Sequence, residues 1–196
     1  MRIALVIASY LLGSIPTGYL VVRLSGNKDV RDLGSGSTGA TNVLRVKGWK
    51  SALPVAVVDI LKGFLPAFLA LKWLDDPAFA ALCGLAAVIG HCYPFSIGFR
   101  GGKGVATSLG ACAAIALWPC LASAGIFLIA LGLTGFVSLG SILGSVAFPF
   151  IVLATGGPKG VFAVSLAIAA VVVLRHAGNI VRLFGGKERK LGQKAS

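Results

Sequence analysis

The chain has 196 residues, of which 57% are hydrophobic and only 12% are charged, and its mean hydropathy is +0.92. A soluble domain, in which about 25% of residues are charged, could not bury so much apolar surface, whereas a lipid bilayer can. The net charge of +12 does not indicate nucleic-acid binding, because the basic residues of a membrane protein collect on its cytoplasmic side.

The apolar segments predict an all-α, polytopic membrane helix bundle of about seven transmembrane helices, forming a single integral-membrane domain over residues 1–196. A spanning helix needs about 20 mostly apolar residues. We expect the first to be a retained helix rather than a signal peptide, since no clear cleavage site follows it. Several are short, so local thinning of the bilayer is expected. The expected spans are 3–23, 51–73, 78–96, 104–118 (with a turn at Trp118-Pro119), 120–136, 139–155 and 160–180.

Seven spans would place the two termini on opposite sides of the membrane. With this topology 14 basic residues lie on one face and only Arg2, Lys72 and Lys159 on the other, while Lys62 lies inside a span. The positive-inside rule then predicts a cytoplasmic C-terminus and an N-terminus outside. The basic face receives Arg23, Lys28, Arg31, Arg45, Lys47, Lys50, Arg100, Lys103, Arg175, Arg182, Lys187, Arg189, Lys190 and Lys194.

The longest hydrophilic loop contains a glycine-rich segment, residues 34–45, with the sequence GSGSTGATNVLR. Glycines let backbone N–H groups converge on an anion, and hydroxyl groups add donors. Arg45 adds a planar guanidinium group that suits phosphate. A short helix opening at Thr41 would also favour an anion at its N-terminus. The segment matches G-x-G-x-x-G, but it follows a membrane helix rather than a strand, which argues against a dinucleotide fold. A flexible linker is the simpler alternative.

A second segment, residues 90–107, has the sequence GHCYPFSIGFRGGKGVAT and joins the third and fourth expected spans on the same face. Its glycine cluster around Lys103 predicts a second anion cradle that leads into a helix. It is not a Walker A motif, because Ile97 takes the place of the first glycine and Gly104 follows the lysine. A tight turn with an exposed lysine is the alternative.

A third segment, residues 175–188, has the sequence RHAGNIVRLFGGKE. His176 and Asn179 are three residues apart and therefore share a helix face. Ionisable groups near membrane depth indicate function, although a basic lipid anchor would have a similar composition. We expect residues 187–190 to be only such an anchor.

Two further patterns are weaker. Asp59 and Lys62 lie three apart within the second span, and a lone charge there would be costly, so they are expected to pair, either as support or at the substrate. Ser138 and Ser141 lie near the same face between the fifth and sixth spans, where helix packing is the simpler function. The four cysteines lie in apolar runs, and no set of residues has metal-ligand spacing.

Six blocks, in this order over nearly the whole chain, resemble the bacterial acyl-phosphate:glycerol-3-phosphate acyltransferase family: GSIPTGYL, GSGSTGATNVLR, DILKG, GHCYPFSIGFRGGKGVAT, SLGSI and RHAGNI. The resemblance implies a multi-pass enzyme of the bacterial inner membrane whose active site faces the cytoplasm. It implies transfer of a fatty acyl group from acyl phosphate to glycerol 3-phosphate, giving 1-acyl-glycerol 3-phosphate (lysophosphatidic acid) and phosphate. This is the first acylation of bacterial phospholipid synthesis, and the family uses neither metal nor cofactor.

The resemblance also implies a set of site residues. Arg45, Lys103 and the backbone of residues 35–41 would bind phosphate, and His176 and Asn179 would position glycerol 3-phosphate. Whether His176 or a substrate phosphate removes the hydroxyl proton stays open, as does which cradle takes which phosphate. The implied catalytic residues are Ser35, Arg45, Lys103, His176 and Asn179. The implied substrate-binding residues are Gly36, Ser37, Thr41, Asn42, Gly101, Gly102, Gly104 and Ser141.

Two other classes of protein fit parts of the pattern. A transporter or channel for organic phosphates could use the basic face as a selectivity filter, but the opposite face lacks charges and no internal repeat is seen. A lipid-binding scaffold would not need paired His176 and Asn179 beside two cradles. The partners expected are the two small-molecule substrates and membrane lipid, and a monomer is compatible with the sequence.

Overall fold

The computed structural model describes residues 1–26 and 28–193, and these residues form an all-helical bundle with no strand. Two 3-10 turns, η1 (Val30–Asp32) and η2 (Phe95–Ile97), lie in the loops. The helices are α1 (Arg2–Gly13), α2 (Thr17–Leu24), α3 (Ala40–Lys47), α4 (Trp49–Leu74), α5 (Pro77–Cys92), α6 (Val105–Ile115), α7 (Leu117–Thr134), α8 (Val137–Ala154), α9 (Lys159–Arg175) and α10 (Ala177–Phe184).

Helix ends follow from local chemistry. Asp76 caps α5, because its side chain accepts a hydrogen bond of 3.0 Å from the backbone N–H of Phe79, and Pro77 occupies the first turn, where a proline costs no hydrogen bond. Gly135 ends α7 with φ +76°, a left-handed conformation that glycine adopts without strain. These caps produce short turns between long antiparallel helices.

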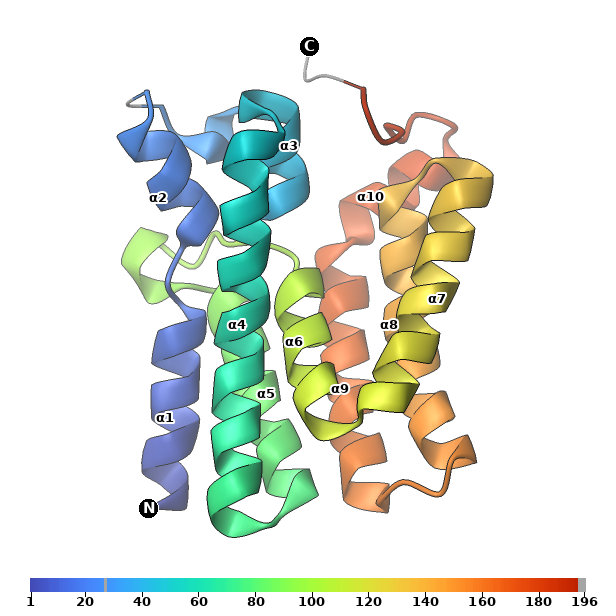
Figure 1. Cartoon of the computed structure of the whole chain (residues 1–196). Coiled ribbons are helices and arrows are strands. Elements are labelled where there is room, and N and C mark those ends of the chain that lie inside the picture. The colour runs from blue at the N-terminus through green and yellow to red at the C-terminus, as the bar shows by residue number, and fades with distance from the viewer. Residues whose placement is uncertain (27, 194–196) are drawn as a thin grey trace.

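The bundle has two halves (Figure 1). Helices α1, α4, α5 and α6 pack together in one half, and α7, α8 and α9 in the other, while α5 packs on α9 between them. Helices α4 and α6 approach closely, since a Cβ at Gly63 would meet the backbone of Thr107 and one at Gly110 the backbone of Ile60. Small residues of this kind allow membrane helices to pack without a hydrophobic driving force.

The predicted count of seven spans is not confirmed. Among the described residues five helical segments are long and apolar enough to cross a membrane, and the α9–α10 pair, bent by 59°, would be a sixth. The expected span 104–118 forms only α6, with 11 residues, which gives a length of about 16 Å against a hydrocarbon core of about 30 Å. The residues directly before α6 form a loop rather than a helix. The predicted turn at Trp118-Pro119 is wrong, because both residues lie in the first turn of α7.

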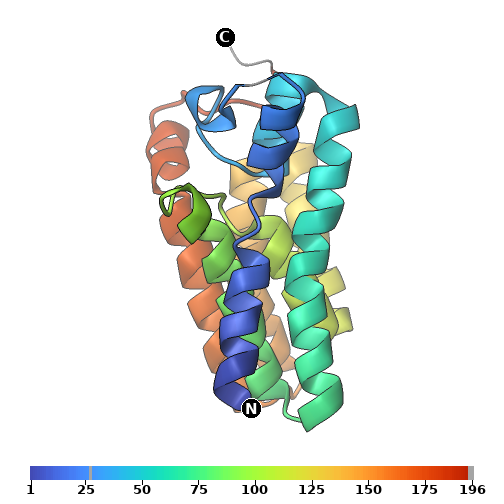
Figure 2. The ribbon, with the colours of Figure 1, turned by 90° about the vertical axis from the view of Figure 1, so that its left-hand side faces the viewer.

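The loops predicted to share one face lie toward one end of the molecule, with the loop that carries η2 further down the bundle than α2 and α3 (Figure 1). The N-terminus lies at the opposite end from the described C-terminal segment (Figure 1), and the view turned by 90° shows α2 and α3 at the same end as that segment (Figure 2). Of the basic residues expected there, Lys194 lies outside the described residues. The fold thus gathers three segments that are far apart in the sequence at one end of the bundle.

Candidate active site

Two adjoining cavities open where the three segments meet. The larger, of about 340 Å³, extends from a polar mouth beside α3 and α10 into the apolar interior between α6 and α8. The smaller, of about 200 Å³, is lined almost entirely by polar and glycine residues. The residues that line both are Ser35, Ser37, Lys103 and Asn179.

The first glycine-rich segment is folded around the side chain of Asn42, which is 2% exposed. Its Oδ1 accepts a 2.8 Å hydrogen bond from the backbone N–H of Ser35. Its Nδ2 lies within hydrogen-bond distance of the carbonyl oxygens of Val30 (3.2 Å), Leu33 (3.0 Å) and Ser37 (2.9 Å). Asn42 therefore uses its polar atoms to shape the loop that presents Ser35 and Ser37.

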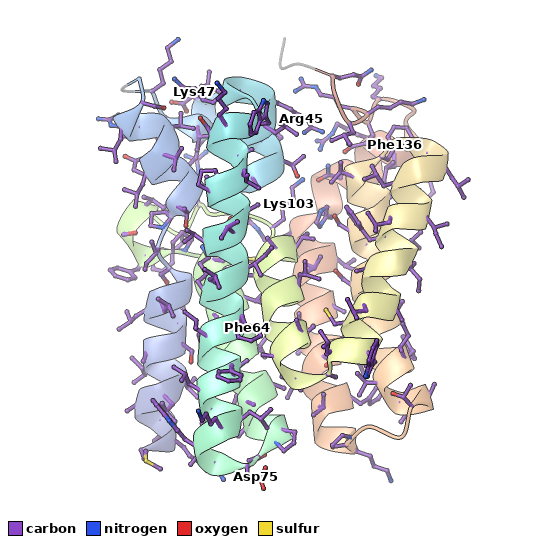
Figure 3. The ribbon with its side chains drawn as sticks, in the orientation of Figure 1. Arg45, Lys47, Phe64, Asp75, Lys103 and Phe136 are labelled. Atoms are coloured by element: carbon purple, nitrogen blue, oxygen red, sulfur yellow. The ribbon has the colours of Figure 1, made fainter. Side chains whose placement is uncertain are left out.

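The predicted short helix after this loop is confirmed as α3, and it carries Arg45 at the mouth of the larger cavity. Figure 3 shows Lys103 between the two halves of the bundle and Arg45 above it. Thr41 lines the larger cavity as well, and Gly36, with φ +70°, lines the smaller one. The segment thus supplies one cation and several small polar groups.

The second segment differs from the predicted cradle of backbone N–H groups. The N–H of Gly101 donates to the carbonyl of Cys92 (3.2 Å) and that of Gly102 to the carbonyl of His91 (3.0 Å). Gly101 lines the smaller cavity, but Gly102 lines neither cavity, and a Cβ there would collide with the imidazole of His91. The cation of this segment, Lys103, is what reaches both cavities.

The third segment supplies the opposite wall. Asn179 accepts a hydrogen bond of 2.5 Å from the Nζ of Lys103 through its Oδ1 atom. His176, which is 2% exposed, lies with Nδ1 2.7 Å from the carbonyl oxygen of Val172. Because a carbonyl only accepts, Nδ1 carries the proton in the neutral ring, and Nε2 keeps its lone pair. Both residues line the larger cavity, although His176 lies at the 59° bend between α9 and α10 rather than on one continuous helix.

Glu188 is the site residue that the sequence interpretation missed. Its side chain is 4% exposed and accepts hydrogen bonds from Ser138 Oγ (2.8 Å), Asn179 Nδ2 (2.6 Å) and Arg182 Nε (2.8 Å). The expectation that residues 187–190 form only a lipid anchor is therefore wrong. The available signal was a single acidic residue in an otherwise basic tail.

The C-terminal segment reaches the site because it is tied to the α7–α8 turn. The backbone N–H of Leu191 donates to the carbonyl of Gly135 (2.8 Å), and the side chain of Lys190 packs on the ring of Phe136. Ser141, on α8, lines the larger cavity and donates its hydroxyl proton to the carbonyl of Val137 (2.8 Å). The tail and α8 therefore close one side of the mouth.

Electrostatics at the mouth are dominated by crowded cations. Burial lowers the pKa of the Lys103 ammonium to about 8, Glu188 opposes that effect, and Arg182, Arg45 and Arg175 add to it. Burial also lowers the pKa of Arg45. For Glu188, burial raises the carboxyl pKa, but hydrogen bonds from Asn179, Ser138 and Arg182 outweigh it and lower the pKa below its usual value. The mouth is thus positively charged around one buried carboxylate.

Beneath the mouth, the predicted pair of Asp59 and Lys62 is confirmed, with Nζ 2.8 Å from Oδ1. The carboxylate also lies 3.6 Å from His91 Nδ1, and Lys62 donates to the carbonyl of Ile15 (2.9 Å). Asp59 and His91 line the larger cavity. Among residues 1–26 and 28–193, no group of three or more His, Cys, Asp or Glu side chains is placed to hold a metal ion.

Comparison with known proteins identifies the family. The family model for glycerol-3-phosphate acyltransferase matches residues 3–186. The glycerol-3-phosphate acyltransferase of Prochlorococcus marinus (strain MIT 9215) is 44% identical over 195 residues, covering 98% of this chain and 99% of that protein. That of Synechococcus sp. (strain JA-3-3Ab) is 47% identical over 189 residues, covering 96% and 92%.

Two crystal structures have the same fold. Both are of PlsY (YgiH), an integral membrane glycerol 3-phosphate acyltransferase. Its glycerol 3-phosphate form has a TM-score of 0.94 at 41% identity, covering 97% of this chain and 96% of the other. Its lysophosphatidic acid form has a TM-score of 0.90 at 39% identity, covering 97% and 95%.

Proposed function

The chain belongs to the glycerol-3-phosphate acyltransferase family, and from that premise we propose that it transfers a fatty acyl group from acyl phosphate to glycerol 3-phosphate. The products are 1-acyl-glycerol 3-phosphate (lysophosphatidic acid) and phosphate. The proposal places the enzyme in the bacterial inner membrane with its active site facing the cytoplasm. The basic end of the bundle, which carries the cavities, supports that orientation.

The observation that carries the proposal is the pair of adjoining cavities of unlike character. The larger has cations at its mouth and an apolar depth, which suits a phosphate joined to a fatty chain. The smaller is polar throughout and suits glycerol 3-phosphate. The apolar depth is lined by Leu109, Cys112, Phe127, Phe148 and Ile168.

Lys103 and Asn179 lie where the two cavities meet, so we assign them to the point where the substrates react. The glycerol hydroxyl oxygen attacks the acyl carbonyl carbon, a new carbon–oxygen bond forms, and the bond from that carbon to the phosphate oxygen breaks. Phosphate leaves with the electron pair. Arg45 and Lys103 neutralise the repulsion between two anionic substrates, and orientation together with electrostatic stabilisation supplies the acceleration.

The hydroxyl proton has two possible acceptors. The Nε2 atom of His176 keeps its lone pair, because Nδ1 donates to Val172, so the neutral ring can accept the proton there. An oxygen of a substrate phosphate is the other acceptor. The remaining predicted residues have supporting roles in this proposal: Ser35, Gly36, Ser37 and Thr41 line the phosphate sites, and Gly104 and Ser141 line the larger cavity.

The test is phosphate release from palmitoyl phosphate by the purified protein in detergent, with and without glycerol 3-phosphate. We expect release that depends on glycerol 3-phosphate and is lost in Arg45→Ala and Lys103→Ala. Mass spectrometry should identify 1-palmitoyl-glycerol 3-phosphate. No release by folded protein across several chain lengths would refute the proposal and direct the work to transport assays in liposomes.

A further inference from the structure

The guanidinium group of Arg175, the last residue of α9, reaches across to the loop that precedes α6. Its Nε donates to the carbonyl oxygen of Gly102 (3.0 Å) and its Nη2 to that of Gly101 (3.1 Å). A planar guanidinium group matches two adjacent acceptors at once, which an ammonium group does not. One side chain therefore holds both peptide oxygens of the glycine pair directly before Lys103.

The other polar groups of the same pair are held by α5. The two N–H groups donate to carbonyl oxygens at the end of that helix, and the ring of Tyr93 packs on the guanidinium of Arg175 at 5.1 Å. Since glycine has no side chain to restrict its own backbone, these four hydrogen bonds fix the path of the chain into Lys103.

The two hydrogen bonds from Arg175 to the carbonyl oxygens of Gly101 and Gly102 form a clamp. This clamp also affects the polarity of the smaller cavity, which is lined by Gly101, Lys103 and Arg175. Carbonyl oxygens that faced this cavity would repel a phosphate group, and Arg175 turns two of them toward itself. The next residue after α9 is His176, and Asn179, which pairs with Lys103, follows three residues later on α10. The same contact therefore sets the second segment against the third.

We propose that Arg175 is a positioning residue for acyl transfer, which clamps the Gly101-Gly102 backbone to α9 and so holds Lys103 against Asn179 at the junction of the two cavities. The proposal rests on the proposed function for its kinetic consequence. The clamp itself consists of hydrogen bonds to the backbone, so its effect on backbone stability can be measured without substrate.

The kinetic test compares Arg175→Lys, which keeps the charge but loses the planar pair of donors (the fork), with Arg175→Gln, which loses both the charge and the fork. Because the fork matters, both variants should raise the KM for glycerol 3-phosphate about tenfold, the effect of losing hydrogen bonds to a charged group, with a smaller change in kcat. Arg23→Lys, an exposed arginine at the end of α2 on the same face, is the control and should leave kinetics unchanged. Wild-type kinetics for Arg175→Lys would overturn the proposal.

The structural test is amide hydrogen exchange of the substrate-free protein in detergent, followed in peptides that cover residues 98–104. We expect Arg175→Lys to accelerate exchange there about tenfold, with other peptides and the thermal midpoint unchanged. Lost activity with unchanged exchange would mean that Arg175 only contacts substrate. Faster exchange throughout the chain would mean a general structural role, and either result overturns the proposal. If the chain lacked acyltransferase activity, the exchange result would still decide whether the clamp exists.

Discussion

The Nζ atom of Lys103 and the Oδ1 atom of Asn179 lie 2.5 Å apart although 76 residues separate them in the chain. Glu188 holds the amide of Asn179 in the orientation that this contact needs, because it accepts a hydrogen bond from the opposite end, Nδ2. The three residues form a charge-assisted chain from the C-terminal segment to the loop before α6.

The pH dependence of the reaction should reflect Lys103. Its pKa is lowered to about 8, so the protonated form that binds phosphate is lost as the pH rises through that value rather than near that of an ordinary lysine. We expect kcat/KM for glycerol 3-phosphate, which reports the free enzyme, to fall above about pH 8. In Lys103→Arg the alkaline fall should disappear, whatever the residual rate, once spontaneous donor hydrolysis is subtracted. An unchanged fall would assign it to another group.

Glu188→Gln should shift the same alkaline fall in kcat/KM. The carboxylate raises the pKa of Lys103, so replacing it with a neutral amide lowers that pKa further. The alkaline fall is expected at lower pH by about one unit, the effect of losing a single nearby opposite charge. Glu188→Asp keeps the charge and is the matched control. A fall that moves to higher pH in Glu188→Gln would contradict this electrostatic assignment.

His176→Gln tests the base. If Nε2 removes the hydroxyl proton, kcat with both substrates saturating should fall by about 10²–10⁴-fold, the usual contribution of a general base. His176→Asn should behave similarly. Phosphate release without a pre-steady-state burst would show that acyl transfer limits the rate in these variants. Near-normal turnover in His176→Gln would exclude the ring as base and leave the substrate phosphate as acceptor.

Gly102→Ala should destabilise the protein. The added Cβ would collide with the imidazole of His91, and overpacking of this kind costs about 1–3 kcal/mol. The matched control is Gly125→Ala on α7, where a Cβ would enter open space. Thermal unfolding in detergent should show a lower midpoint for Gly102→Ala alone. Equal midpoints for the two variants would mean that the ring moves aside at little cost.

Ala124→Phe should change the choice of donor chain. Ala124 lines the larger cavity on α7, so a phenyl ring there would occupy volume that a long chain needs. We expect the KM for palmitoyl phosphate to rise more than that for a donor with a much shorter chain. Ala122→Phe, on an exposed position of the same helix, is the control. Equal effects on both donors would place the fatty chain elsewhere.

Hydropathy located most of the helices because a long apolar run has few alternatives to a membrane helix. The expected spans 51–73 and 139–155 differ from α4 (Trp49–Leu74) and α8 (Val137–Ala154) by no more than two residues at either end. The prediction of a membrane span over 104–118 was wrong because apolar composition does not distinguish a full crossing from a short helix that follows a loop into the bundle. The same ambiguity put the next turn at Pro119, although proline is tolerated in the first turn of a helix.

The catalytic residues that the family resemblance implied lie in three separate motifs, which the fold brings to one cavity. Ser35, Arg45, Lys103, His176 and Asn179 all line the larger cavity. Hydrogen bonds between segments were not predictable, because they depend on how distant segments approach one another. Glu188 was therefore assigned to a solvated tail, and the N–H groups beside Lys103 were assigned to an anion although they bond to α5.

The short helix α6 has a consequence for how a lipid enzyme handles its donor. Because α6 begins so far along the bundle axis, Lys103 lies below Arg45 (Figure 3), and the apolar depth of the larger cavity continues directly from it. Moving a fatty chain from hydrocarbon into water costs about 0.8 kcal/mol for each methylene group. In the proposed reaction the polar acceptor reaches the acyl carbonyl within the bundle, so the fatty chain can stay in the apolar depth of the larger cavity during the transfer and this cost is avoided.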